Sequence, residues 1–154
     1  MKHIAILAAL LAPFLFAEEL AKKPPVLAFC LVLPAEKEGV PKLPVMGTNA
    51  TVCLEPEVLM DAKSVALAKA DEGHAGGFQI SLTFTSAGTK AFADLTRKNV
   101  GRRLAILIDG KVLSAPAIRA PIPGGKAVIT GSFTKKQAEE LAEQISAAVK
   151  NARK

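Results

Sequence analysis

Hydrophobic and polar residues follow their clearest pattern in the second half of the chain. Large apolar side chains alternate with polar ones over 78–85, which predicts a strand with one buried face. Residues 104–108 are apolar at every position, which is typical of a central strand covered on both faces. Asp109-Gly110 follows directly and favours a two-residue hairpin turn. The pattern therefore predicts a sheet that contains a tight hairpin.

The second strand of this hairpin is predicted over 111–118. Pro116 lies within it and has no backbone N–H to donate, so we expect this strand at an edge of the sheet. A Pro- and Gly-rich stretch over 35–50 is predicted to be a loop. Three other apolar runs complete the predicted strands, over 26–33, 51–54 and 127–131.

Three segments have the pattern of a helix. Asp61 can cap a helix over 61–70, which is rich in Ala, Leu and Lys. Thr85 or Ser86 can cap a second helix, which Gly101 can end. Residues 134–137 form a capping box, and an amphipathic helix is predicted after it.

The order of these elements indicates the fold class. In chain order they read β-β-α-β-α-β-β-β-α. This order predicts an α+β fold, with a mixed, mainly antiparallel sheet and helices packed on one of its faces. Half of the 154 residues are hydrophobic, but the chain has no Trp and no Tyr. We therefore expect a core of Leu, Val, Ile, Ala and Phe.

The first 17 residues read MKHIAILAALLAPFLFA. A short positive segment with Lys2 precedes an apolar run of about 13 residues, which is shorter than the ~20 residues that span a bilayer. A small residue, Ala17, stands at the expected cleavage point. This pattern predicts a cleaved signal peptide over 1–17 and a periplasmic or secreted protein. Residues 18–50 are predicted to contain a leader, the first strand and the Pro- and Gly-rich loop. A folded domain is predicted over 51–150 and a basic tail over 151–154.

Two cysteines, Cys30 and Cys53, lie in apolar runs that are predicted to be strands. In an exported protein an even number of cysteines suggests a disulfide. We therefore predict a Cys30–Cys53 bridge between neighbouring strands. The alternative is two buried free thiols that pack as small hydrophobic side chains.

The charge of the chain is mildly basic, at +6. Lys2 is the only charged side chain within 1–17, so 19 basic and 14 acidic residues leave +5 on the rest. The basic residues are spread along the chain, whereas a nucleic-acid-binding protein would cluster them and add aromatic side chains for stacking. No nucleic-acid partner is therefore predicted. A surface of this kind could also meet acidic phospholipid headgroups, which would place the protein near a membrane.

Few residues of the chain are candidates for catalysis or metal binding. His74 lies in a Gly-rich loop and is the one histidine after residue 17, so it cannot form a zinc site with other histidines. Ser132 and Lys135 fit the Ser-x-x-Lys pattern of some acylating enzymes, but a helix cap explains the same residues without catalysis. The sequence therefore predicts no catalytic residue, no metal site and no cofactor.

The run over 82–133 carries a long ordered set of motifs and reads LTFTSAGTKAFADLTRKNVGRRLAILIDGKVLSAPAIRAPIPGGKAVITGSF. It closely resembles the head subdomain in the first periplasmic domain of SecD. Residues 54–66 also resemble the entry strand and first helix of that subdomain. Most of the matched residues can also be read as requirements of the fold. The motif residues assigned a structural role are Gly88, Asn99, Gly101, Arg102, Asp109, Gly110, Pro116, Gly131 and Phe133.

The resemblance implies a function in protein export. SecD, with SecF, assists export, and its head is expected to contact the emerging chain. We therefore expect a stand-alone, non-enzymatic exported domain that binds unfolded or extended polypeptide, or components of the Sec translocase. The preferred place is the strand over 111–118, where Val112, Ser114 and Ile118 would contact a polypeptide added to the edge. Alternatively, the proline and flanking cations of this strand only protect it from aggregation.

Two other classes of function stay open at this point. One is a secreted hydrolase that uses Ser132 and Lys135. The other is a secreted inhibitor or interaction module.

Overall fold

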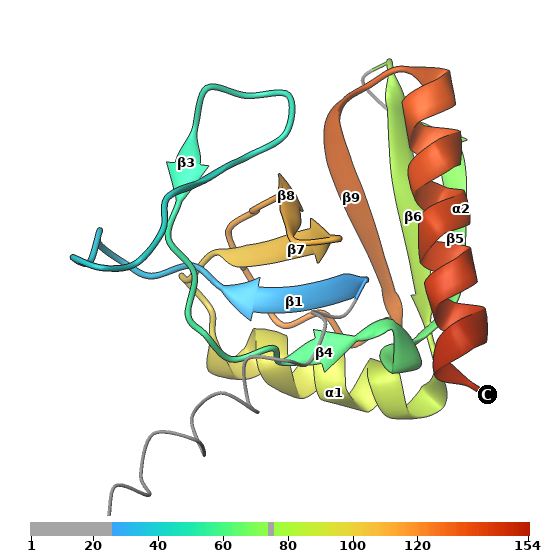
Figure 1. Cartoon of the computed structure of the whole chain (residues 1–154). Helices are drawn as coiled ribbons and strands as arrows, with labels where there is room; N and C mark the ends of the chain where they lie inside the picture. The colour runs from blue at the N-terminus through green and yellow to red at the C-terminus, as the bar shows by residue number, and fades with distance from the viewer. Residues whose placement is uncertain (1–25, 74–75) are drawn as a thin grey trace, which may run out of the picture.

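The computed structural model describes residues 26–73 and 76–154. Over these residues the chain forms three β-sheets with antiparallel strand pairs and two α-helices (Figure 1), which confirms the predicted α+β class. The strands are β1 (Leu27–Leu31), β2 (Leu43–Pro44), β3 (Thr51–Val52), β4 (Met60–Asp61), β5 (Val65–Glu72), β6 (Phe78–Phe84), β7 (Leu104–Ile108), β8 (Lys111–Ser114) and β9 (Lys126–Phe133). The helices are α1 (Ser86–Lys98) and α2 (Lys135–Ala152), with a 3-10 turn, η2 (Ala62–Ser64), before β5.

The predicted signal peptide and His74 lie outside the described residues. Within 26–73 and 76–154, no helix is both long enough and apolar enough to span a membrane.

The central sheet has the strand order β4-β1-β7-β8. β1 and β7 pair along their whole length, from Leu27 opposite Ile108 to Leu31 opposite Leu104. Every residue of both strands is buried. One row of side chains faces the main core and the other faces a second apolar cluster. The continuous apolar run at 104–108 is therefore a central strand covered on both faces, as predicted.

The hairpin between β7 and β8 has the predicted two-residue turn. Asp109 and Gly110 have φ values of 47° and 77°, and a type I′ turn needs positive φ at both positions. β8 lies at the edge of the central sheet, as predicted, but it ends at Ser114, before Pro116.

The second large sheet has the order β5-β6-β9. Ile80, Leu82 and Phe84 of β6 are buried, and the residues between them are half-buried, which confirms the alternation seen in the sequence. α2 begins at the predicted capping box and packs its apolar side against this buried face. The opposite face carries the exposed side chains of Leu67 and Val128 among polar neighbours.

The helix predicted over 61–70 is wrong, and so is the first helix inferred from the resemblance of 54–66. Asp61 does accept a hydrogen bond from the backbone N–H of Lys63, at 2.9 Å, but it caps only η2. The chain then enters β5, which pairs with β6 along its whole length. Ala, Leu and Lys favour a helix by fractions of a kcal/mol per residue. Cross-strand pairing and packing under α2 outweigh that preference.

Three phenylalanines join the two large sheets to α1. Phe29 comes from β1, Phe84 from β6 and Phe92 from α1. Their ring centroids lie 4.6 Å apart for Phe84 and Phe92, 6.1 Å for Phe29 and Phe84, and 6.3 Å for Phe29 and Phe92. These are ordinary separations for tilted and edge-on aromatic pairs. The main core is therefore continuous from the central sheet to the three-stranded sheet.

Residues 26–50 are part of the same folded unit. β1, which the sequence analysis assigned to a segment before the domain, lies in the middle of the central sheet. The loop predicted over 35–50 contains β2, which pairs with β3. We call residues 32–59, between β1 and β4, the excursion. Val45 and Val52 of the excursion are buried in the second apolar cluster, against Ala105 and Leu107 of β7. The excursion therefore covers the face of the central sheet that the main core leaves open.

The predicted Cys30–Cys53 disulfide is wrong, because both cysteines are buried free thiols. They do lie on neighbouring segments, but the register keeps them apart. The N–H of Leu33 donates to the carbonyl of Cys53 at 2.9 Å, so Cys53 lies opposite Leu33. Cys30 lies three residues before Leu33, which places it about 10 Å away along the strand at a rise of ~3.3 Å per residue. A disulfide requires α-carbons within about 7 Å.

Candidate polypeptide-contact site

The residues predicted to contact polypeptide lie in the interior. Val112 is 1% exposed, Ser114 9% and Ile118 5%. Val112 belongs to the second apolar cluster and Ile118 to the main core. A partner therefore cannot reach these three side chains while the surrounding segments stay in place.

The backbone next to these residues is also largely paired. The N–H of Met46 donates to the carbonyl of Val112 at 2.9 Å, and Val45 forms a parallel bridge with Val112. Ile118 accepts from the N–H of Gly101 and donates to the carbonyl of Arg102, each at 2.8 Å. The sheet edge at β8 is thus occupied by the chain's own residues, which blunts it against further strand addition.

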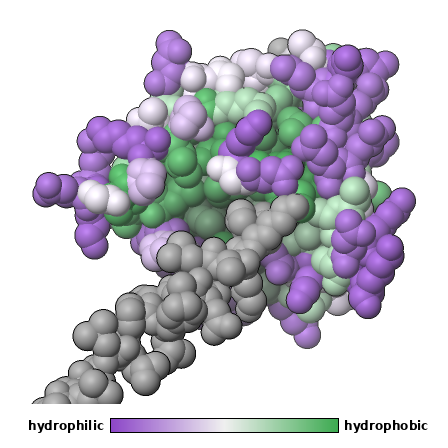
Figure 2. Space-filling model, viewed as in Figure 1, coloured by the Kyte–Doolittle hydropathy of each residue, from purple (hydrophilic) through white to green (hydrophobic). Residues whose placement is uncertain are grey.

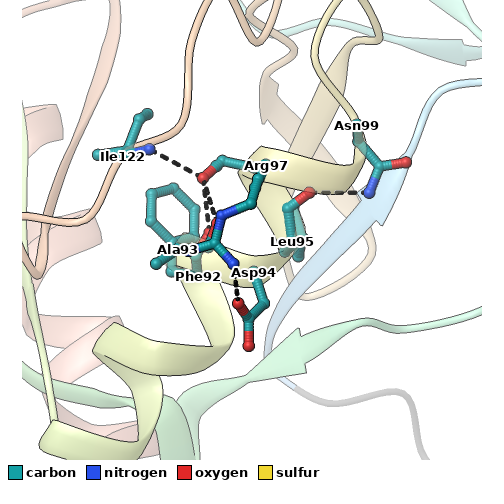
Figure 3. A network of polar contacts seen from close by, with 8 residues as sticks. Phe92, Ala93, Asp94, Leu95, Arg97, Asn99 and Ile122 are labelled. Atoms are coloured by element: carbon teal, nitrogen blue, oxygen red, sulfur yellow. Dashed lines mark hydrogen bonds and ion pairs between the residues drawn. The ribbon is translucent and has the colours of Figure 1, made fainter.

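The motif residues near the end of α1 hold the fold together, and Figure 3 shows one of them, Asn99, bonded to Leu95. Asn99 is the C-cap, and its side-chain amide donates to the carbonyl of Leu95 at 2.8 Å. Gly101 has a φ of 86°, which a side chain would strain. The guanidinium of Arg102 donates to Asn99 at 3.4 Å and forms an ion pair with Glu55. This ion pair links the end of α1 to the segment that precedes β4.

The remaining motif residues also have structural surroundings. A side chain at Gly88 would collide with the carbonyl of Ser64, and one at Gly131 would meet the ring of Phe133 at 2.6 Å. Phe133 itself is buried in the main core. The carbonyl of Pro116 accepts from the N–H of Leu104 at 2.9 Å.

Ser132 and Lys135, the residues of the hydrolase alternative, are both exposed. Between them Thr134 caps α2, accepting from the N–H of Gln137 at 3.3 Å while the side chain of Gln137 accepts from the N–H of Thr134 at 2.9 Å. This capping box accounts for the segment. Within the described ranges, no group of three or more His, Cys, Asp or Glu side chains is arranged to hold a metal ion.

An open apolar pocket of about 450 Å³ lies beside the central sheet, on the excursion between β1 and β4. Half-buried aliphatic side chains and exposed prolines form most of its wall, with one Lys and one Glu at the rim. Its lining residues are Leu33, Lys37, Gly39, Val40, Pro41, Leu43, Leu54, Glu55 and Pro56. Figure 2 shows hydrophobic residues gathered in the middle of one face of the molecule, with hydrophilic residues around its margin.

Backbone hydrogen bonds fix one wall of this pocket, at Leu54 and Glu55, to the end of β1. Val32 forms an antiparallel bridge with Leu54, and the N–H of Glu55 donates to the carbonyl of Leu31 at 2.8 Å. On the floor, Leu43 and Leu54 pack against the second apolar cluster. The pocket is therefore built on a rigid base rather than on a free loop.

The outer wall is a short loop closed by an ion pair. The ammonium of Lys42 lies 2.6 Å from the carboxylate of Glu36. The hydrogen bond from this pair, together with the negative charge of Glu36, raises the pKa of Lys42. Both groups are exposed, so the pair stabilises the loop only slightly.

Sequence reasoning missed this pocket because it treated 35–50 as a loop without a role. A signal was present: the aliphatic residues Val40, Leu43 and Val45 stand among the prolines and glycines of that stretch. A polar connecting loop would not need them.

Comparisons with known proteins agree on one family. Residues 38–149 match the family described as "SecDF, P1 head subdomain". The protein translocase subunit SecD of Acidaminococcus fermentans is 42% identical over 113 residues, which cover 71% of this chain and 27% of that protein. SecDF of Thermus thermophilus is 46% identical over 84 residues, covering 54% of this chain and 11% of that protein. The chain thus corresponds to a small part of each relative.

Solved structures give the same result. The crystal structure of SecDF in a super-membrane-facing form superposes with a TM-score of 0.67 at 34% identity, over 84% of this chain and 20% of that one. A second structure, from work on SecDF as a membrane component that enhances protein export, gives a TM-score of 0.64 at 33% identity. It covers 84% of this chain and 66% of that one.

Proposed function

Because the chain belongs to the SecDF P1 head subdomain family, we propose that it is a non-catalytic periplasmic module of protein export that contacts polypeptide in an extended, unfolded state. The relatives are translocase subunits, and the protein described as enhancing protein export shares the fold over most of this chain. The exported location rests on the signal peptide predicted over 1–17 and on the family.

The observation that carries the proposal is the apolar pocket on the excursion between β1 and β4. A chain in transit exposes aliphatic side chains in no fixed order, so its receptor needs apolar area rather than a pattern of hydrogen bonds. The pocket supplies such area, and exposed apolar surface of this kind commonly marks an interaction site. Of its two charged side chains, Glu55 is paired with Arg102, so the pocket adds little charge beyond that of Lys37.

The edge of β8 remains a second contact point only if the segment around Met46 leaves Val112. That release would cost one backbone hydrogen bond and the contacts of Val45 with the second apolar cluster. A client strand could then replace the lost bond through its own backbone.

Site-specific photo-cross-linking tests both contact points. A cross-linking residue is placed at one position at a time. Val40 and Pro56 test the pocket, and Val112, Ser114 and Ile118 test the edge. The exposed Lys136 of α2 is the control. The probe is reduced, carboxymethylated lysozyme, which stays unfolded in buffer. We expect adducts at Val40 and Pro56 well above those at Lys136. Adducts that are equal at all sites, or that occur only at Lys136, would refute the pocket.

Weakened binding by a surface variant gives an independent measurement. Val40→Ser removes apolar area from the pocket rim, and Val128→Ser removes a similar area from the outer face of the other sheet. Loss of one half-buried aliphatic side chain costs about 1 kcal/mol of binding, or about fivefold in Kd. We expect this loss for Val40→Ser alone.

A further inference from the structure

Two apolar side chains project into solvent near the C-terminal end of α1. Val100 is 50% exposed and Ile122 is 38% exposed. They come from different connections, one after α1 and the other before β9. An isolated exposed valine or isoleucine needs no explanation, but these two are held close to the same helix end and among cations.

Ile122 is fixed to α1 through Thr96. The hydroxyl of Thr96, which is fully buried, donates to the carbonyl of Phe92 at 2.8 Å and accepts from the backbone N–H of Ile122 at 2.9 Å (Figure 3). Pro121 and Pro123 flank Ile122 and restrict its backbone. The loop is therefore docked through its backbone, which leaves the side chain of Ile122 directed away from the core.

The segment before Ile122 is fixed beside the turn that contains Val100. The N–H of Gly101 donates to the carbonyl of Ile118, and the N–H of Ile118 donates to the carbonyl of Arg102, both at 2.8 Å. Arg119 therefore follows directly from a residue that is bonded to the end of α1. Val100, Arg119 and Ile122 thus share one corner of the molecule.

Arg97 and Lys98, in the last turn of α1, add charge to this corner. Arg97 pairs with Asp94 at 2.7 Å, whereas Lys98 and Arg119 are exposed with no ion pair recorded in the described part of the chain. Three cations against the one carboxylate of Asp94 leave two positive charges. We call the set of Arg97, Lys98, Val100, Arg119 and Ile122 the basic–apolar corner.

We propose that the basic–apolar corner binds the surface of a bilayer that contains anionic phospholipid. The two apolar tips can enter the boundary between headgroups and acyl chains, while the long cationic side chains reach the phosphates around them. Cations near an anionic membrane each add to the attraction, and the positive charge of the whole chain acts in the same direction. This contact is separate from the apolar pocket, so it does not depend on polypeptide binding.

Co-sedimentation of the full chain with vesicles measures the contact. Vesicles of phosphatidylglycerol and phosphatidylcholine, at 3:7, are compared with pure phosphatidylcholine at about 0.1 M and about 0.5 M salt, where screening differs strongly. We expect binding only to the anionic vesicles and a clear loss at the higher salt. Equal binding to both kinds of vesicle, or binding to neither, overturns the proposal.

Charge variants then locate the contact. The triple variant R97Q/K98Q/R119Q should bind about 100-fold more weakly, at about fivefold per cation. The matched control, K135Q/K136Q/K150Q, removes three exposed cations from α2 and should keep most of the affinity. Every variant carries the same residues 1–25, so any membrane affinity of that segment is common to all. Equal losses in the two triple variants would mean non-specific attraction and would overturn the assignment.

A polarity-sensitive fluorophore reports whether the apolar tips enter the bilayer. It is attached through I122C, and through V128C on the outer face of the three-stranded sheet as the control; Cys30 and Cys53 are buried. Anionic vesicles should shift the emission to the blue at I122C and leave it unchanged at V128C. No shift at I122C, or a shift only with an acidic polypeptide such as polyglutamate, contradicts membrane contact.

Discussion

Replacement of Gly88 by alanine tests how α1 is docked. Gly88 lies in the first turn of α1 and is buried. A β-carbon there would lie 2.1 Å from the carbonyl oxygen of Ser64 and 2.9 Å from its carbonyl carbon. Both are backbone atoms, so no side-chain rotation relieves the overlap. Either α1 or the turn at η2 must move by about 1 Å to restore ordinary van der Waals separation.

That movement has a cost that can be estimated from the neighbouring contacts. The same Ser64 oxygen accepts from the N–H of Thr85 at 2.9 Å, so a shift of this size breaks the bond. Overpacking of a buried site costs about 1–3 kcal/mol, and the lost hydrogen bond about 1 kcal/mol. Alanine returns up to ~1 kcal/mol through its higher helix propensity. We expect Gly88→Ala to lower the free energy of unfolding by about 2 kcal/mol.

Urea unfolding followed by far-ultraviolet circular dichroism is the suitable assay, because the chain has no Trp or Tyr for fluorescence. Gly124→Ala is the matched control. Gly124 has open space within 4 Å of its added β-carbon and is not in the positive-φ region. This control should stay within about 0.5 kcal/mol of the wild type or gain slightly. A Gly88→Ala protein as stable as the control would show that α1 is not packed against Ser64 as closely as argued.

Two further predictions concern titratable groups. Burial raises the pKa of the Cys30 thiol, so we expect Ellman's reagent at pH 8, without reductant, to leave Cys30 unmodified in the native protein. After unfolding, the reagent should detect both thiols. If it detects no thiol after unfolding, the two cysteines form a disulfide. The pKa of Asp71 is lowered, first by a hydrogen bond from Ser81 and then by Lys69, whose ammonium lies 3.3 Å from the carboxylate. A carboxyl group with a lowered pKa stabilises the fold at pH values above its unfolded pKa of about 3.9. This stabilisation is lost as the pH falls through the pKa of the folded state. The difference in Tm between wild type and Asp71→Asn should therefore be present at pH 6 and absent near pH 2; a difference that persists at pH 2 contradicts this.

The features that the sequence predicted correctly are determined locally. The strand β6, the Asp109-Gly110 turn and the capping box before α2 each depend on residues within a few positions of one another. Positive φ at the turn and the reciprocal hydrogen bonds of the capping box are properties of those residues themselves. Such elements can be predicted without knowledge of their neighbours in space.

The features that it predicted wrongly depend on partners far away in the chain. Residues 61–70 have a helical composition, but pairing with β6 and cover from α2 make β5 a strand. Cys30 and Cys53 are both in strand-like runs, yet only the register of the two segments shows that they lie too far apart for a bridge. Neither pairing nor register can be read from composition.

The candidate site follows the same rule. Pro116 correctly indicated that β8 is an edge, but nothing local showed that residues 45–46 would occupy that edge. Because the excursion between β1 and β4 covers the second face of the central sheet, its inner aliphatic side chains are buried there and its outer ones remain half-exposed. The burial of Val112 and the opening of the pocket at Val40 are thus two results of one packing arrangement. A variant that detaches the excursion should therefore expose the β8 edge and destroy the pocket at the same time. A client that needs the pocket would then bind more weakly, whereas a client that needs the edge would bind more tightly.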